Sequence, residues 1–481
     1  MSKRTKIVCT IGPASESKAT LAKMIRAGMD VARLNFSHGK YSNHRLLINN
    51  IRLASQQANR PMAIMQDLQG PRIRIGEVHH DGIDLRRGET VVFVPEQLVN
   101  YKLLITGQQK IVPLGYDQLY RFVKVGRHIL INDGLIDVKV SRIKDRCIYG
   151  EVIKSGMVFS HKGINLPGVT IQADVITKKD KQDLIFGLRQ GIDYVALSFV
   201  KDASNVRLLR KLIGRHPAKI IAKIERKEAL DNFTEILAAA DGIMVARGDL
   251  GIEIRPATVP LVQKEMIQQC LRAGKPVIVA TQMLESMVIN ARPTRAEVSD
   301  VANAVIDHTD AVMLSGETAF GKYPVEAVQM MADIVKQTER SKYDDVPLHY
   351  LKLAHQTIPD SISFVADDLA HQEQVKAIVV NSLSGQAARL IARHRPELPL
   401  IVLTNNRATL RQLALIWGAQ GYFVPPCKTL DELLLKSVQL VKQRRLVQPN
   451  NKIVVVTGHP VGRSQGINLV KLHTVLGRKQ K

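Results

Sequence analysis

Two strand-like runs decide the fold of this chain: Ile220-Ile-Ala-Lys-Ile-Glu225 and, further on, Ile243-Met-Val-Ala-Arg-Gly-Asp249. Each is a short β-branched run that leads into charged residues, and a segment with helical periodicity separates them. A strand, a helix and a second strand in this order form one unit of a parallel sheet. We therefore expect the charged residues after both strands to lie at the same end of that sheet.

Six further runs of this kind occur within the first 342 residues, and helical stretches follow most of them. Eight strand-helix units predict a closed parallel (β/α)8 TIM barrel, whose active site lies at the C-terminal ends of the strands. The six further runs are residues 7–10, 31–34, 63–66, 194–198, 277–281 and 311–314.

The pattern is interrupted once, between the third strand and the helix that starts near residue 178. This interval has alternating strands at 90–94, 128–131 and 135–140 with Gly-containing turns, which predicts an inserted all-β lid domain. After residue 343 a helix at 361–370 and strands at 377–380, 400–403, 421–424 and 453–456 predict a C-terminal α/β domain. The expected division is 1–71 and 172–342 for the barrel, 72–171 for the lid and 343–481 for the C-terminal domain.

Composition narrows the classes of protein. The 481 residues include 68 Lys and Arg but only 44 Asp and Glu. The resulting net charge of +24 favours anionic partners. With one Trp and 4% aromatic residues, stacking platforms for nucleic acid are scarce, so no specific nucleic-acid partner is expected. No stretch is long and apolar enough for a membrane span, and no signal peptide is recognisable. Four cysteines without a Cys-x-x-Cys pair fit a reducing cytoplasm.

The residues at the predicted strand ends are strongly polar. Each of these residues by itself could equally be a polar group with a purely structural hydrogen bond. Taken together, they predict a functional site. Glu225 and Asp249 would suit Mg²⁺ or Mn²⁺ with open positions for substrate oxygens, and Lys223, Arg33 and Arg247 would hold phosphate. The sequence thus indicates phosphoryl chemistry.

One motif is misleading. Residues 316–323, GETAFGKY, match a P-loop except at Tyr323, where a Ser or Thr is needed for Mg²⁺. Because Pro324 follows and the strand is the last of the barrel, we interpret the segment as a loop entering a helix. A Gly-x-Gly-x-x-Gly fingerprint is also absent from the sequence, which argues against a dinucleotide-binding dehydrogenase.

Seven segments resemble the pyruvate kinase family closely, in its bacterial, K⁺-independent type, and the resemblance covers essentially the whole chain. They are 5–13 (TKIVCTIGP), 30–39 (DVARLNFSHG), 162–168 (KGINLPG), 221–225 (IAKIE), 245–251 (VARGDLG), 293–297 (PTRAE) and 314–319 (LSGETA). The resemblance implies a glycolytic phosphotransferase that makes pyruvate and ATP from phosphoenolpyruvate and ADP.

The resemblance also implies roles for individual residues. Glu225 and Asp249 would bind the metal, Lys223 would stabilise the phosphoryl group and the enolate, and Arg33 would grip the phosphate. Thr281 would help to route a proton to the enolate, and Lys223 is not assigned as the proton donor. The further implied residues are Ala246, Arg247, Gly248 and Asp249 for substrate, Ser315 and Glu317 for a water chain, and His38, Arg74 and Lys162 for nucleotide.

The chain departs from the family's common pattern after the third strand. Where most members read Asp-Thr-Lys-Gly-Pro-Glu and require K⁺, this chain reads Asp67-Leu-Gln-Gly-Pro-Arg72. The threonine hydroxyl is lost at Leu68, and a permanent guanidinium replaces a carboxylate. We therefore predict that K⁺ is not required. The other cation ligands implied by the resemblance, Asn35, Ser37 and Asp67, would have structural or Arg-pairing roles.

In many relatives a loop of the C-terminal domain binds a phosphorylated activator, and the equivalent here is residues 381–387, NSLSGQA. Ser382, Ser384, Gly385 and Gln386 would form this site for a sugar phosphate or a nucleoside monophosphate. A plain strand-to-helix turn explains the loop equally well. The resemblance also suggests a homotetramer.

Two rival functions stay open at this level. A Mg²⁺-dependent barrel lyase acting on pyruvate enolate would share the metal and the arginine but would need no ADP. A basic nucleic-acid-binding or scaffold protein with a relic site would be retained on DNA in a salt-sensitive manner without turnover. The intact Lys223, Glu225 and Asp249 argue against the scaffold, and Arg74 and Lys162 argue against the lyase.

Overall fold

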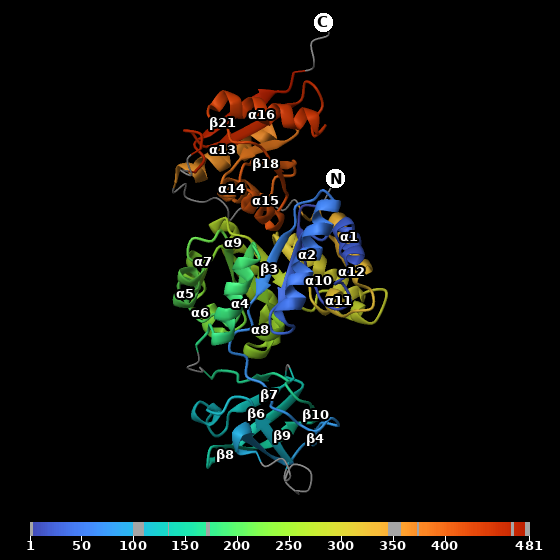
Figure 1. Ribbon diagram of the computed structural model, residues 1–481, viewed down its shortest axis with the longest axis vertical. Helices are drawn as coiled ribbons and strands as arrows, with labels where there is room; N and C mark the ends of the chain where they lie inside the picture. The colour runs from blue at the N-terminus through green and yellow to red at the C-terminus, as the bar shows by residue number, and fades with distance from the viewer. Residues whose placement is uncertain are drawn as a thin grey trace.

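The computed structural model describes residues 3–99, 110–132, 134–169, 174–344, 357–372, 375–462 and 466–476. Figure 1 shows three bodies in a row, with the barrel between the lid and the C-terminal domain. The barrel, the lid and the C-terminal domain each have sheets of their own. The predicted boundary between residues 171 and 172 lies outside the described residues.

The barrel is closed by eight parallel strands in the order β1-β16-β15-β14-β13-β12-β3-β2, which confirms the predicted fold. Their interior-facing and helix-facing side chains are almost entirely buried, as expected when helices cover a closed parallel sheet. The strands are β1 Lys6–Thr10, β2 Val31–Asn35, β3 Ala63–Asp67, β12 Tyr194–Leu197, β13 Lys219–Ile224, β14 Gly242–Ala246, β15 Val277–Ala280 and β16 Ala311–Leu314.

Helices surround the barrel, and several begin at side-chain caps that are readable in the sequence. Thr177 and Thr294 each form a capping box, with Asp180 and Glu297 respectively. The P-loop-like segment enters α12 at Pro324, as predicted, but its first four residues form the short helix α11 where a loop was expected. The helices are α1 Lys18–Ala27, α2 Tyr41–Gln57, α4 Lys178–Arg189, α5 Ala203–Ile213, α6 Lys227–Asp231, α7 Phe233–Ala239, α8 Arg247–Glu253, α9 Val259–Ala273, α10 Arg295–Ile306, α11 Gly316–Ala319 and α12 Pro324–Thr338.

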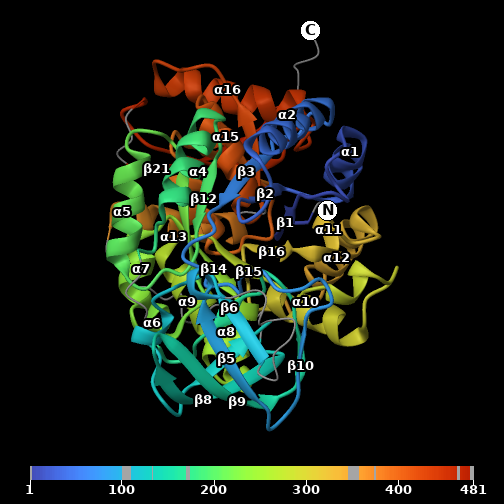
Figure 2. The ribbon, with the colours of Figure 1, turned by 60° about the horizontal axis from the view of Figure 1, so that its bottom comes forward.

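The inserted lid is all-β, as predicted, and is built on a six-stranded sheet and a two-stranded sheet with a core of its own. In Figure 2, where the lid end comes forward, β5, β8 and β9 lie in front of the barrel. The sheet orders are β11-β7-β8-β9-β5-β6 and β10-β4. The strands are β4 Ile83–Leu85, β5 Thr90–Pro95, β6 Lys110–Leu114, β7 His128–Ile131, β8 Ile136–Lys144, β9 Cys147–Lys154, β10 Gly156–Val158 and β11 Ile164–Asn165.

The C-terminal domain has an open sheet in the order β19-β18-β17-β20-β21, with helices packed on it. The four predicted strands are present, and a fifth, antiparallel β21 was not expected because half of its side chains are exposed. None of the described helices is long and apolar enough to cross a membrane. The elements are α13 Ile358–Gln372, β17 Ile378–Asn381, α14 Gln386–Ala392, β18 Leu400–Thr404, α15 Arg407–Gln412, β19 Ala419–Phe423, α16 Leu430–Gln443, β20 Lys452–Thr457 and β21 Leu469–Thr474.

The C-terminal domain closes the end of the barrel opposite the lid. Leu415, from the turn between α15 and β19, is fully buried among the side chains that fill the barrel interior. The Tyr194 hydroxyl, at the start of β12, donates to the Gln412 carbonyl at 2.7 Å. The barrel therefore has one end sealed by protein and one end that faces the lid.

At the sealed end, four aspartates repeat one arrangement. Each stands immediately before an even-numbered barrel strand in chain order and accepts a hydrogen bond from a backbone amide of the preceding strand. The four pairs are Asp30 with Ile7, Asp193 with Ile64, Asp241 with Ile220 and Asp310 with Val277, at 2.8 to 3.0 Å. Each aspartate also pairs with at least one Arg, namely Arg60, Arg52 and Arg411, Arg210 and Arg395.

Candidate active site

The strand ends that face the lid carry a connected set of charged side chains. Arg33, in β2, contacts Asp67, at the end of β3, with N–O distances of 2.6 Å from Nη2 and 2.7 Å from Nε. Lys223, in β13, places its Nζ 2.8 Å from Glu225 Oε1 and 3.4 Å from Asp67 Oδ1. Three strands therefore bring two cations and two carboxylates together, as the sequence predicted for Arg33, Lys223 and Glu225.

The protonation of this set follows from burial and from its mutual charges. Burial lowers the pKa of Lys223, but the carboxylates of Asp67 and Glu225 outweigh burial and raise it above its ordinary value. Burial raises the pKa of Asp67, yet Lys223 and Arg33 hold it below its ordinary value. Lys223 is thus a fixed ammonium at neutral pH, suited to stabilising negative charge.

Glu225 and Asp249 form a donor set that fits a hard divalent cation. Burial raises the pKa of the Glu225 carboxyl, and the nearby negative charge of Asp249 raises it further, against the opposing effect of Lys223. Two carboxylates that repel one another, one buried and one about a quarter exposed, leave a place where added positive charge is favourable. Carboxylate oxygens are the ligands that Mg²⁺ and Mn²⁺ prefer.

The ends of β14 and β15 meet at Thr281. The Thr281 Oγ1 accepts a hydrogen bond from the Gly248 amide at 2.8 Å, and its carbonyl accepts one from Arg247 Nη2 at 2.7 Å. Arg247 Nη1 also contacts Asp300 Oδ1 at 2.7 Å. Thr281 has φ +70°, which is rare for a β-branched residue and typical of strain at functional sites.

The structure also gathers Ala246, Gly248 and Asp249, because Ala246 ends β14 and the other two lie in the first turn of α8. The Gly248 amide, which donates to Thr281 Oγ1, connects this segment to the end of β15. Arg247, by contrast, is engaged with Asp300 and with the Thr281 carbonyl, so it braces the turn after β15.

Ser315 and Glu317 lie together at the end of β16. The Glu317 carboxylate is fully buried and accepts hydrogen bonds from the amides of Ser315 at 2.7 Å and Leu284 at 3.1 Å. Burial raises the pKa of Glu317 above its ordinary value. A buried carboxyl held by backbone amides is well placed to hold or release a proton.

The residues expected to face nucleotide gather where the barrel meets the lid. Arg74 is bridged to Gly163, the neighbour of Lys162, and its Nη1 donates to the His161 carbonyl at 2.9 Å. Burial, Arg74 and Arg72 lower the pKa of His38. His38 is therefore a neutral imidazole beside positive charge at neutral pH.

The region of the implied monovalent-cation ligands is occupied by the protein's own contacts. Asp67 pairs with Arg33 and Lys223, and Asn35 Oδ1 accepts the Ser37 amide at 3.1 Å. Leu68 is buried. Arg72 lies 4.0 Å from Asp249 Oδ1, and a Cβ on Gly163 of the lid would come 2.9 Å from its Nε.

Sequence reasoning missed Ser198 and Phe199, which follow β12. The Ser198 hydroxyl lies 2.8 Å from Lys223 Nζ, and the Phe199 amide donates to Glu225 Oε2 at 2.8 Å. Ser198 is the last residue of the strand predicted over 194–198, and this place at a strand end was the available signal. A neutral serine after an apolar strand carries little chemical information until its neighbours are known.

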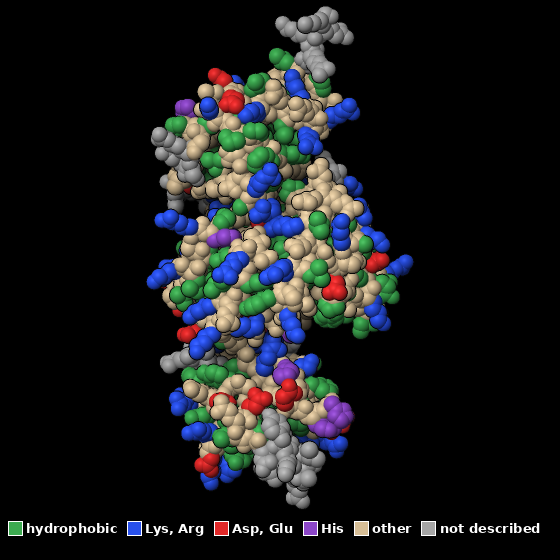
Figure 3. All heavy atoms as spheres, viewed as in Figure 1, with side chains coloured by type: hydrophobic (Ala, Val, Ile, Leu, Met, Phe, Trp, Pro, Cys, Tyr) green, Lys and Arg blue, Asp and Glu red, His purple; other side chains and the backbone are tan. Residues whose placement is uncertain are grey.

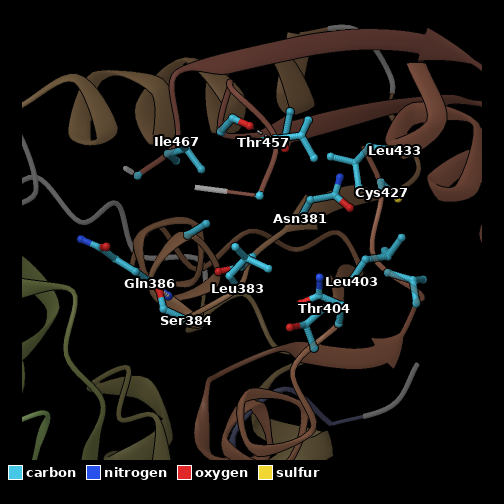
Figure 4. Close-up of a pocket in the computed structure, with 18 of the residues that line it drawn as sticks. Asn381, Leu383, Ser384, Gln386, Leu403, Thr404, Cys427, Leu433, Thr457 and Ile467 are labelled. Carbon is cyan, nitrogen blue, oxygen red and sulfur yellow. Dashed lines mark hydrogen bonds between the residues drawn. The ribbon is translucent and has the colours of Figure 1, made fainter. Parts of the chain in front are cut away.

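The predicted activator loop lies in the C-terminal domain, at the wall of a pocket (Figure 4). Ser382, Ser384 and Gln386 line the pocket, and the Gly385 amide donates to Ser382 Oγ at 3.0 Å. Gly385 has φ +80°, a conformation that favours glycine. Leu383, Leu403 and Cys427 also line it, and none of the described lining residues is Lys or Arg.

The fold and the strand-end site together define a barrel enzyme that handles phosphorylated anions with a divalent cation. Figure 3 shows Lys and Arg spread over one face of the barrel and C-terminal domain, with few acidic side chains among them. Family profiles agree: the profile of the pyruvate kinase barrel domain matches residues 2–328, and that of the pyruvate kinase alpha/beta domain matches residues 360–473.

Three named relatives align over nearly the whole chain. The pyruvate kinase of Geobacillus stearothermophilus is 44% identical over 481 residues, which cover 99% of this chain and 81% of the relative. Those of Sporosarcina psychrophila and Bacillus licheniformis are 42% and 43% identical, covering 98% of this chain and 80% of each relative. The chain belongs to the pyruvate kinase family and is a phosphotransferase that forms pyruvate and ATP from phosphoenolpyruvate and ADP.

Proposed function

We propose that the strand-end cluster centred on Lys223 is where this chain transfers the phosphoryl group. The observation that carries the proposal is the Lys223 ammonium, held between Glu225 and Asp67 with Arg33 beside them. Arg33 grips the phosphate of phosphoenolpyruvate, and Lys223 stabilises charge on the phosphoryl group in transfer and on the enolate that remains. The backbone from Ala246 to Asp249, with Thr281, holds the substrate carboxylate.

Glu225 and Asp249 would hold Mg²⁺ or Mn²⁺. The ion supplies charge neutralisation for the phosphate and for the product oxygens. The Glu225 carboxylate is held in a fixed orientation before the ion binds. One of its oxygens accepts a hydrogen bond from a backbone amide, and the other contacts the Lys223 ammonium. A pre-oriented ligand loses little freedom when a cation binds.

The proton that converts enolate to pyruvate would arrive by another route than Lys223, whose raised pKa makes it a poor donor at neutral pH. Thr281 would help to route this proton to the enolate carbon. Ser315 and the buried Glu317 carboxyl would support a chain of water molecules behind it.

His38, Arg74 and Lys162 would face the phosphates of ADP and ATP from the barrel and the lid. The bridge between Arg74 and Gly163 supports this assignment because it holds Arg74 beside the neighbour of Lys162 within the lid. Closing the lid would then bring Lys162 toward the phosphates and reduce the access of water.

K⁺ would not be required. Asp67 already has two cationic partners, and the buried Leu68 offers no side-chain oxygen. The fixed charge of Arg72, placed 4.0 Å from Asp249, would supply positive charge near the metal site.

The loop of Ser382, Ser384, Gly385 and Gln386 would bind a sugar phosphate or a nucleoside monophosphate. Its hydroxyls and amides support phosphate binding, while the neutral lining supports only weak binding. A cytoplasmic homotetramer is the assembly we propose for the enzyme.

The test is a coupled assay of pyruvate release with phosphoenolpyruvate, ADP and Mg²⁺. We expect turnover that depends absolutely on ADP, whereas a barrel lyase would release pyruvate without it. Retention on DNA without any turnover would instead support the scaffold function.

A further inference from the structure

We propose that the turn Ser198–Phe199, directly after β12, is a positioning element that fixes Lys223 and Glu225 for phosphoryl transfer. The inference rests on the roles proposed above for these two side chains. Ser198 acts through Lys223, and the Phe199 amide acts through Glu225. Neither residue needs to contact the substrate for this role.

Ser198 is a neutral acceptor for the Lys223 ammonium. Its side chain is 3% exposed, and its Oγ lies 2.8 Å from Lys223 Nζ, 2.7 Å from the Leu68 carbonyl oxygen and 3.3 Å from Asp67 Oδ1. A hydroxyl has one hydrogen, and the short contact directs it to the Leu68 carbonyl. The lone pairs of Ser198 therefore remain for Lys223.

The neutrality of this acceptor matters because the other two acceptors of Lys223 are carboxylates. Glu225 lies 2.8 Å from Nζ and Asp67 lies 3.4 Å from it. Without Ser198, the ammonium would pair more tightly with Glu225 and would compete with a divalent cation for the same carboxylate. Ser198 thus holds Lys223 in place without using a metal ligand.

Phe199 fixes the other side of Glu225. Its amide donates to Glu225 Oε2 at 2.8 Å, and it does so from φ +55°, a left-handed conformation that is rare for an aromatic residue. Such a conformation is strained and persists only where the surroundings enforce it. Gly70 is part of those surroundings, because a Cβ there would lie 2.8 Å from Phe199 Cδ2.

The same turn connects the site to the loop after β3. Ser198 donates to Leu68, and Phe199 packs against Gly70, so residues 68–70 and the turn support one another. This loop is where the chain departs from the K⁺-dependent pattern. The turn Ser198–Phe199 therefore connects the altered residues of this loop to Lys223.

The first test compares Ser198→Ala with Thr309→Val. Thr309 is also buried and also donates its hydroxyl to a backbone carbonyl, that of Val277 at 3.1 Å, but it lies at the sealed end of the barrel. Loss of a hydrogen bond to a charged group predicts that kcat falls about 10- to 100-fold in Ser198→Ala, with the KM for phosphoenolpyruvate changed less than about twofold. Thr309→Val should keep the kcat of the natural chain, and Ser198→Thr, which retains the oxygen, should recover most of it.

The second readout does not need turnover. Mn²⁺ binding, measured by electron paramagnetic resonance without substrate, should weaken about three- to tenfold in Ser198→Ala, because Lys223 then competes for Glu225. Ser198→Thr and Thr309→Val should bind Mn²⁺ as the natural chain does. Ser198→Cys, of similar volume but with a poor acceptor, carries the same expectation should Ser198→Ala fail to fold.

The outcomes separate the two proposals. A natural chain without ADP-dependent pyruvate formation would overturn the assignment of the site to phosphoryl transfer. An active natural chain, with Ser198→Ala and Ser198→Cys unchanged in both kcat and Mn²⁺ binding, would overturn the positioning role alone. Equal losses in Ser198→Ala and Thr309→Val would assign Ser198 to stability only.

Discussion

The two ends of the barrel are both rich in charge, yet they are arranged in opposite ways. At the sealed end, Asp30, Asp193, Asp241 and Asp310 each accept a backbone amide and each have an Arg partner, and the four pairs are spread around the rim. At the lid end the charges converge. There the Lys223 ammonium contacts two carboxylates, those of Glu225 and Asp67, and a hydroxyl. The Glu225 carboxylate is in turn close to the negative charge of Asp249.

This difference teaches how charge serves either stability or chemistry. At the sealed end, the buried aspartates have their hydrogen-bond and charge partners within the protein, and these contacts hold neighbouring strands in register. Such aspartates are poor sites for binding a ligand, because their acceptor atoms are already used. Where two carboxylates such as Glu225 and Asp249 repel one another, binding of a metal cation is favourable, and the fixed cations beside them favour an anionic substrate. The following predictions are ordered from the largest expected effect to the smallest.

Glu225→Gln should abolish most of the Mg²⁺-activated turnover. A neutral amide is a much poorer ligand for a hard cation, and we expect a loss of about 10³-fold, near the value of a several-kcal/mol electrostatic contribution. The measurement is the Mg²⁺ dependence of turnover, with thermal melting as the control for folding. Mg²⁺ activation that stays as in the natural chain would remove the metal assignment.

Lys223→Met should reduce phosphoryl transfer about 10²- to 10³-fold. Exchange of the pyruvate methyl protons with solvent should survive better, because Lys223 is not the proton donor in this mechanism. Both rates are measured on the same preparation, by coupled assay and by NMR. Equal loss in the two reactions would contradict the division of roles.

Asp193→Ala tests the sealed end. Asp193 is buried and accepts from Arg52 at 3.0 Å, from Arg411 at 2.7 Å and from the Ile64 amide, so its removal leaves two guanidinium groups without their shared partner. The free energy of unfolding should fall by about 3 kcal/mol. The measure is denaturant unfolding, and kcat of the folded fraction should change less than twofold. A large loss of kcat with unchanged stability would mean that the sealed end takes part in the chemistry.

Asp30 predicts an acid dependence for the same end. Burial raises the pKa of this carboxyl, but Lys3 and Arg60 outweigh burial and hold it at about 2. Because the folded pKa lies below the unfolded value of about 3.9, the contribution to stability is complete above about pH 5 and is lost toward pH 2, by about 2 kcal/mol.

Asp30→Asn should flatten this part of the stability curve between pH 5 and pH 2, as measured by unfolding at a series of pH values. The natural chain and Thr309→Val serve as references. A variant whose acid dependence matches that of the natural chain would show that Asp30 does not carry the effect.

The smallest effect concerns monovalent cations. Turnover should be nearly equal in a K⁺ buffer and in a tetramethylammonium buffer of the same ionic strength, a match that a chain of net charge +24 requires. Leu68→Thr with Arg72→Glu should create dependence on K⁺, whereas Arg72→Glu alone should mainly impair turnover. Many-fold activation of the natural chain by K⁺ would refute this, and the family assignment would stand.

The sequence by itself determined the eight barrel strands, the all-β class of the inserted lid and four of the five strands of the C-terminal sheet, because their signals are local. β-branched runs such as Val277–Ala280 and caps such as Thr177 depend only on neighbours in the chain. It also predicted that Lys223, Glu225, Asp249 and Arg33 gather at one end of the barrel, since a parallel barrel carries the C-terminal ends of its strands to the same end.

Only the tertiary structure decided which groups meet across strands. The Ser198 hydroxyl, the left-handed Phe199 amide and the Leu415 side chain in the barrel interior acquire their roles from residues that are distant in the chain. The sequence did not predict β21 for the same reason. It is a strand because it pairs with β20, and its own residues lack a clear apolar pattern. Hydrogen bonds and burial depend on three-dimensional neighbours, and a polar side chain in sequence gives no measure of them.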